Sequence, residues 1–152
     1  MRTRLTTLSA YVILLMMATC GGCYRSLSRD LVNAAYVGEV GEIETLIQKG
    51  ANPEALAVDG WTPLTMAARE GHLEAVNVLL RSGAKIDAPE GGGNTALFWA
   101  AFYNRRDVVK VLLAKGANSA KMAKGGETAL HVAIRLNHSE SADLLRQAGA
   151  KE

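Results

Sequence analysis

A 33-residue period is the strongest constraint that this sequence places on its fold. Four Gly-Ala pairs recur at that interval, and threonine, leucine and alanine residues recur with them. The recurring sets are Gly50, Gly83, Gly116 and Gly149; Thr62, Thr95 and Thr128; Leu31, Leu64, Leu97 and Leu130; Ala34, Ala67, Ala100 and Ala133; and Leu46, Leu79, Leu112 and Leu145. A fixed period over about 120 residues predicts a stack of similar units.

Each unit is predicted to contain two helices. In the second unit, Thr62 can cap free N–H groups and Pro63 suits the first helical position, so a helix is expected up to Gly71. A second helix is expected over residues 73–81, where the apolar residues share one face. Gly83 supplies the left-handed residue that ends this helix. The following residues carry Gly, Pro and Asn and predict a projecting turn.

Composition limits how these units can pack. Aromatic residues make up only 5% of the 152 residues, while 49% are hydrophobic, so leucine, alanine and valine must build the core. The alanines should keep the first helix of each unit thin, so that neighbouring units can approach closely.

The units resemble ankyrin repeats. The resemblance is carried by DGWTPLTMAAREGHLEAV at 59–76 with LLRSGA at 79–84, by GNTAL at 93–97, by GETALHVA at 126–133 and, more weakly, by residues 30–52. It covers residues 29–150 and implies an all-α solenoid of paired antiparallel helices with projecting turns. The implied repeats are 29–58, 59–91, 92–124 and 125–150.

The two ends of the array depart from the repeat pattern. Arg29-Asp30 replaces Thr-Pro in the first unit, and in the last unit Arg146 and Ser141 stand where other units carry aliphatic residues. A terminal repeat presents a polar outer face to water. We therefore expect a complete, closed array that is not a fragment of a longer solenoid.

The resemblance also implies where a protein partner binds, namely in a concave groove lined by the turn tips and the first helices. The corresponding turn-tip positions are Asp59, Trp61, Gly92, Asn94, Lys124 and Glu127. The corresponding helix positions are Tyr36, Val37, Arg69, Glu70, Phe102, Tyr103, Arg135 and Leu136.

Aromatic residues distinguish the third unit. Trp61 is expected at an exposed turn position, and together with Phe102 and Tyr103 it is interpreted as a partner contact, because Trp, Tyr and Arg are common interface anchors. For Phe98 and Trp99 two interpretations stay open. They either contact a partner or fill space between units, where a neighbouring unit has Thr and Met.

Neither catalysis nor cofactor binding is predicted. The sequence has no G-x-S-x-G, no phosphate loop and no paired Cys/His cluster, so we expect a protein that is not an enzyme and has no metal or cofactor. By resemblance, His72 and His131 are expected to hydrogen-bond between units. The glycine-rich segment 91–94 is interpreted as a flexible turn.

The N-terminal segment has the character of an export signal. Arg2 and Arg4 precede an apolar run, and residues 17–23 resemble a bacterial lipoprotein cleavage site, with Cys20 favoured over Cys23 as the lipidated residue. The apolar run is short for a membrane span, which needs about 20 residues, although a retained anchor is the alternative. Residues 1–23 are therefore assigned to the signal and 24–28 to a short tether.

Charge gives no support for nucleic-acid binding. The full chain has 17 Lys+Arg against 15 Asp+Glu, and removal of the signal removes two arginines, which leaves a formal balance of zero. The leading interpretation is a monomeric, membrane-tethered and periplasm-facing protein of the bacterial envelope that binds a protein partner. The alternatives are a secreted effector that binds a host protein and a small enzyme or metal carrier using the three histidines.

Overall fold

The computed structural model describes residues 21–57 and 59–151, with side chains described from residue 27 onward. Residues 1–20 of the predicted export signal, including Cys20, lie outside the described residues, as does the side chain of Cys23. Within the described ranges, no helix combines the length and the apolar character needed to cross a membrane.

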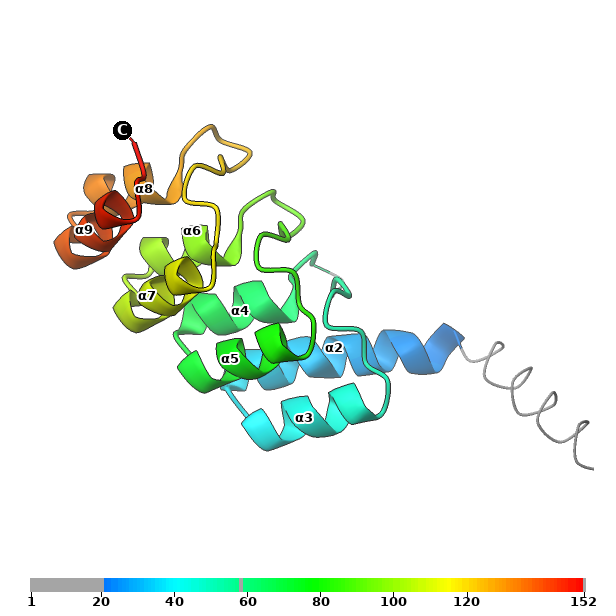
Figure 1. The fold of residues 1–152 in the computed structure, drawn as a ribbon. Helices are drawn as coiled ribbons and strands as arrows, with labels where there is room; N and C mark the ends of the chain where they lie inside the picture. Colours follow the sequence, from blue (N-terminus) through cyan, green and yellow to red (C-terminus); the bar gives the residue numbers. More distant parts are fainter. Residues whose placement is uncertain (1–20, 58, 152) are drawn as a thin grey trace, which may run out of the picture.

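The described part of the chain forms eight helices and no strand (Figure 1). They are α2 (Gly21–Val37), α3 (Val40–Gln48), α4 (Pro63–Glu70), α5 (Leu73–Arg81), α6 (Ala96–Phe102), α7 (Arg106–Ala114), α8 (Ala129–Arg135) and α9 (Ser139–Gln147). Consecutive helices pair across short turns, which gives four helix pairs. The stack of similar units predicted from the 33-residue period, and the all-α solenoid implied by the resemblance, are confirmed.

The helix pairs stack into two layers (Figure 1). The first helices of the pairs, α2, α4, α6 and α8, contact one another in that order, and α3, α5, α7 and α9 form the second layer. Long turns project from the body between successive pairs. Because each pair contacts mainly its neighbours, the architecture is a one-dimensional array.

The predicted signals at the helix ends are confirmed. The hydroxyl groups of Thr62, Thr95 and Thr128 accept hydrogen bonds from the backbone N–H three residues later and so cap α4, α6 and α8. The glycines of the four Gly-Ala pairs all have positive φ, between 84° and 94°. This left-handed conformation ends each second helix at little cost because glycine has no Cβ.

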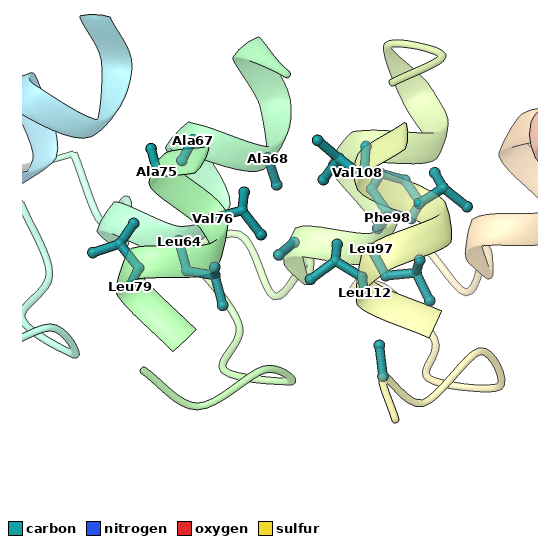
Figure 2. Packing of buried hydrophobic residues seen from close by; sticks show 14 of the residues in the cluster. Leu64, Ala67, Ala68, Ala75, Val76, Leu79, Leu97, Phe98, Val108 and Leu112 are labelled. Carbon is teal, nitrogen blue, oxygen red and sulfur yellow. The ribbon is translucent and has the colours of Figure 1, made fainter. Parts of the chain in front are cut away.

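Leucine and alanine build the core that joins the pairs (Figure 2). The two periodic leucine sets are at most 6% exposed, and the alanines that begin at Ala34 are at most 3% exposed. Figure 2 shows Leu64 near Leu79 within one pair and Leu97 near Leu112 within the next. The alanines of the first helices leave room for neighbouring pairs to approach closely.

A second set of contacts links the end of each first helix to the next pair. His72 Nε2 lies 2.9 Å from the Tyr36 carbonyl oxygen, Arg105 Nε donates to the Arg69 carbonyl oxygen at 2.9 Å, and His138 Nδ1 lies 2.9 Å from the Ala101 carbonyl oxygen. These side chains supply hydrogen bonds to backbone carbonyl groups near the ends of α2, α4 and α6, where intrahelical donors run out, and the Ala101 carbonyl also accepts from the Asn104 N–H at 3.2 Å.

The histidine predictions are therefore right for His72 and wrong for His131. The His131 ring stays within its own unit, where Nδ1 lies 2.7 Å from the Thr128 hydroxyl and completes the cap of α8. The contact between units is made by His138, which stands two periods after His72 in the same repeat position. No group of three His, Cys, Asp or Glu residues in the described ranges could share a metal ion.

The structure revises the description of both ends. Arg146 is exposed, but Ser141 is fully buried and its hydroxyl donates to Asn104 Oδ1 at 2.8 Å, so it joins α9 to the turn between α6 and α7 and does not belong to a polar outer face. At the other end α2 begins at Gly21, so residues 24–28, predicted to form a short tether, are helical. The first unit has Arg29-Asp30 where the second has Thr62-Pro63, and α2 continues through these residues without a cap.

The glycine-rich turn at 91–94 is held by a buried carboxylate. Glu90 is only 8% exposed, and its side chain accepts hydrogen bonds from the backbone N–H groups of Gly92 (2.5 Å) and Asn94 (3.1 Å) and from the Asn94 amide (2.6 Å). Gly91 N–H also donates to the Gly60 carbonyl oxygen at 2.7 Å. The expected flexible turn is therefore hydrogen-bonded internally and to the preceding turn.

The contact between these two turns predicts that a glycine-to-alanine substitution destabilises the protein more at Gly60 than at Gly126. Gly60 and Gly126 occupy equivalent sites with φ of 83° and 80°, but a Cβ at Gly60 would lie 2.8 Å from the Gly91 Cα, while one at Gly126 would meet nothing within 4 Å. Gly126→Ala should lower the free energy of unfolding by about 1 kcal/mol through backbone strain alone. Gly60→Ala should lower it by about 1–3 kcal/mol more through the clash.

Urea unfolding of the two full-length variants, followed by circular dichroism, measures the difference. Equal losses in both would show that the turns do not pack as described.

Candidate functional site

Five aromatic side chains gather where the second and third helix pairs meet. They are Trp61, Phe98, Trp99, Phe102 and Tyr103, which include both tryptophans and both phenylalanines of the chain. The Trp61 and Trp99 rings have centroids 5.0 Å apart, and Trp99 and Tyr103 stack at 6.1 Å with 25° between their planes. Phe102 lies 5.5 Å from Trp99 and 5.0 Å from Tyr103. We call these five residues the aromatic cluster.

The structure separates the two interpretations of Phe98 and Trp99. Phe98 is 7% exposed and packs in the core beside Leu97 and Val108 (Figure 2). Trp99 is half-buried, and its ring contacts three other members of the cluster besides Phe98. Its Nε1 is buried and has no hydrogen-bond partner among the described residues. Phe98 therefore fills space, whereas Trp99 joins the core to the surface.

Trp61 is not the freely exposed turn residue expected from the sequence. It is half-buried because its ring packs against Trp99 and against the guanidinium of Arg69. The next residue, Thr62, begins α4 as its cap, so the turn that carries Trp61 is fixed to the helix that carries Arg69. A partner would meet Trp61 as part of a packed surface.

Arg69 lies between two aromatic rings. Its Cζ atom is 5.3 Å from the ring centroid of Trp61 and 5.3 Å from that of Tyr103. Hydrogen bonding to the Tyr103 side chain raises the pKa of the Arg69 guanidinium above its usual value. Glu70, predicted beside it, contributes one carboxylate oxygen 3.5 Å from Arg69 Nε. Cation–π contacts of this kind contribute about 0.5–1 kcal/mol each at exposed sites.

A separate polar pair occupies the equivalent region of the last unit. Arg135 Nε and Nη2 donate to the two carboxylate oxygens of Glu127 at 2.8 and 3.0 Å. The hydrogen bonds from Arg135 lower the pKa of Glu127 and raise that of Arg135 itself. The two predicted site residues therefore satisfy each other, in contrast to Arg69.

The remaining predicted positions are arranged around these two features. Asp59 and Lys124 are exposed at turn tips, Leu136 is half-buried against the core, and Asn94 is held by Glu90. Tyr36 and Val37, at the end of α2, are 51% and 59% exposed. Sequence reasoning missed Glu90. The signal that could have identified it is an acidic residue directly before three glycines, since the backbone N–H groups of such a turn need a hydrogen-bond acceptor.

The comparisons with known proteins agree with this architecture. A family model described as ankyrin repeats in three copies matches residues 31–90 and 86–152. The chain belongs to the ankyrin-repeat family. Members of this family are generally non-enzymatic protein-interaction modules, so the chain is a protein-binding module. A comparison with curated proteins gives no match.

The burial of the aromatic cluster predicts two classes of alanine variant. Phe98→Ala should lower the free energy of unfolding by about 3–5 kcal/mol, as expected for a buried phenylalanine. Tyr103 is 39% exposed, so Tyr103→Ala should cost only the ring contacts, about 1–2 kcal/mol.

Thermal and urea unfolding of the full-length variants give both values. A loss for Tyr103→Ala as large as that for Phe98→Ala would place Tyr103 in the core and remove it from the candidate site.

Proposed function

We propose that this ankyrin-repeat protein holds one protein partner in a groove along the layer of first helices, and that it acts by binding alone. The aromatic cluster with Arg69 is the observation that supports this proposal. It presents Trp, Tyr and Arg together, which are the residue types that dominate binding energy at protein interfaces. Tyr36, Val37 and Tyr103 add exposed apolar area on the same layer of helices.

The packing of the cluster favours recognition by a rigid surface. The rings of the cluster contact one another, and Arg69 lies between two of them. Few side-chain rotamers therefore remain to be fixed when a partner binds. Side chains that are already ordered reduce the entropic cost of association. An interface of standard size would bury roughly 800 Å² on each side, an area that several neighbouring repeats can supply together.

We further propose that the protein is exported to the bacterial envelope and held at a membrane by a lipid on Cys20 or Cys23, facing the periplasm. The support is the sequence of the leader, with its basic start, its short apolar run and its lipoprotein-like end. Several acyl chains would hold the protein firmly, because one chain alone anchors only marginally. In this setting the partner would be an envelope protein.

The groove proposal predicts which variant loses a partner. The double variant Tyr36→Ala with Tyr103→Ala removes exposed rings from the first-helix layer, so recovery of the partner in cross-linked pull-downs from membranes should fall at least tenfold. The control variant Arg106→Ala with Glu140→Ala removes an exposed 3.0 Å ion pair between α7 and α9 in the other layer, and should recover the partner normally. Equal recovery by both variants would contradict the groove.

The tether proposal is tested by acyl labelling in bacterial cells. The full-length chain should incorporate radiolabelled palmitate and fractionate with membranes, and Cys20→Ser should lose both properties while Cys23→Ser keeps them. The reverse pattern would assign the lipid to Cys23. Absence of label from the unmodified chain would contradict the lipid tether and leave the retained anchor and the secreted effector as the remaining interpretations.

A further inference from the structure

We propose that Arg69 is a carboxylate-binding residue of the groove, and that it selects a partner segment with an Asp or Glu side chain next to an apolar residue. The carboxylate would meet the edge of the Arg69 guanidinium, and the apolar residue would lie against Tyr36, Val37 and Tyr103. This inference rests on the proposed function, because it names the chemistry of the partner that the groove would hold.

Aromatic rings hold the Arg69 guanidinium in place. The rings of Trp61 and Tyr103 each lie 5.3 Å from its Cζ atom, and the Tyr103 side chain is also hydrogen-bonded to it. The N–H donors of arginine lie in the guanidinium plane in a fixed fork that matches the two oxygens of a carboxylate. A guanidinium already held by rings loses little further freedom when a carboxylate binds.

The charge of Arg69 is only weakly compensated. Among the residues that the structure describes, its ion pair is with the adjacent Glu70, through an Nε–oxygen distance of 3.5 Å. One Nη donates to the Met66 sulfur at 3.7 Å, which is a weak acceptor. Arg135 shows the contrasting case, since two of its nitrogens bind both oxygens of Glu127. Arginine has five N–H donors, so Arg69 retains donors for a partner besides those that contact Glu70, Met66 and the Tyr103 side chain.

A second arginine increases the positive charge at this place. Arg105 donates from Nε to the Arg69 carbonyl oxygen at 2.9 Å, and its side chain passes beside Gly71 at the end of α4. Two arginines therefore lie close together, and the structure gives Arg69 a single acidic contact, with Glu70. This local excess of positive charge complements an acidic group on the partner.

The apolar half of the partner segment follows from exposure on both sides of Arg69. Tyr36 occupies the position equivalent to Arg69 one repeat earlier. Tyr36 is 51% exposed, Val37 is 59% exposed and Tyr103 is 39% exposed. An isolated carboxylate would leave this apolar area in contact with water. A segment that pairs an acidic residue with an aliphatic or aromatic neighbour covers both features.

The test begins with selection of peptides from a random dodecapeptide display library on the full-length protein. The most enriched peptide is then synthesised together with a twin in which each Asp or Glu is replaced by Asn or Gln. Both titrations can be followed by tryptophan emission, because Trp61 and Trp99 are the only tryptophans of the chain and both lie in the aromatic cluster.

The acidic peptide should bind the unmodified protein about ten- to hundredfold more tightly than its amide twin, the factor expected for hydrogen bonds to a charged group. Arg69→Gln should remove this difference. Arg69→Lys keeps the charge without the planar fork and should retain only part of it. Arg106→Gln, on α7 in the second layer, is the matched control and should preserve the full difference.

Equal binding of the two peptides, or selection of basic peptides, would overturn the role of Arg69. If Tyr36→Ala with Tyr103→Ala still weakened such peptides, the groove would stand and only this inference would fall. If no selected peptide changed tryptophan emission, or if none responded to any groove variant, both proposals would fall. Circular dichroism checks that Arg69→Gln is folded. If Arg69→Gln unfolds, Arg69→Lys is compared with the unmodified protein in its place.

Discussion

The packing of leucine against alanine between neighbouring helix pairs is the interaction on which the structure depends. A single pair has two amphipathic helices and no partner for its outward apolar faces, so it gains a core only by stacking. Alanine at positions such as Ala67 and Ala100 keeps the first helices close, and leucine at Leu64 and Leu97 fills the remaining space. The positions proposed to line the groove repeat every 33 residues because the helix pairs that carry them stack through this contact.

The aromatic cluster is an exception built on that regular frame. At the positions where α4 carries Thr65 and Met66, α6 carries Phe98 and Trp99, so the third unit is wider than its neighbour at the same place. The extra volume reaches the surface through Trp99, where Trp61 and Tyr103 pack against it. A local departure from the repeat thus creates a distinctive surface without disturbing the stack, because Phe98 remains in the core.

Most of the fold could be predicted from the sequence because its signals are local and repeated. Caps such as Thr62, terminators such as Gly83 and the faces of the short helices depend on residues within a few positions of each other. The errors concern contacts between units. Ser141 looked like a solvent-facing replacement, but Asn104 of the preceding unit accepts its hydrogen bond. Trp61 looked exposed, but Trp99 and Arg69 cover it. Periodicity identifies equivalent positions and carries no information about which neighbour each side chain meets.

The aromatic cluster has a mechanical aspect, because it lies across a joint between two repeats. Trp61 and Arg69 belong to one helix pair, Trp99 and Tyr103 to the next, and the hydrogen bond from Arg105 to the Arg69 backbone crosses the same joint. A ligand seated there would resist flexing of the array at that point. By thermodynamic linkage, a force or second contact that bends this joint would then change the affinity of the cluster for such a ligand.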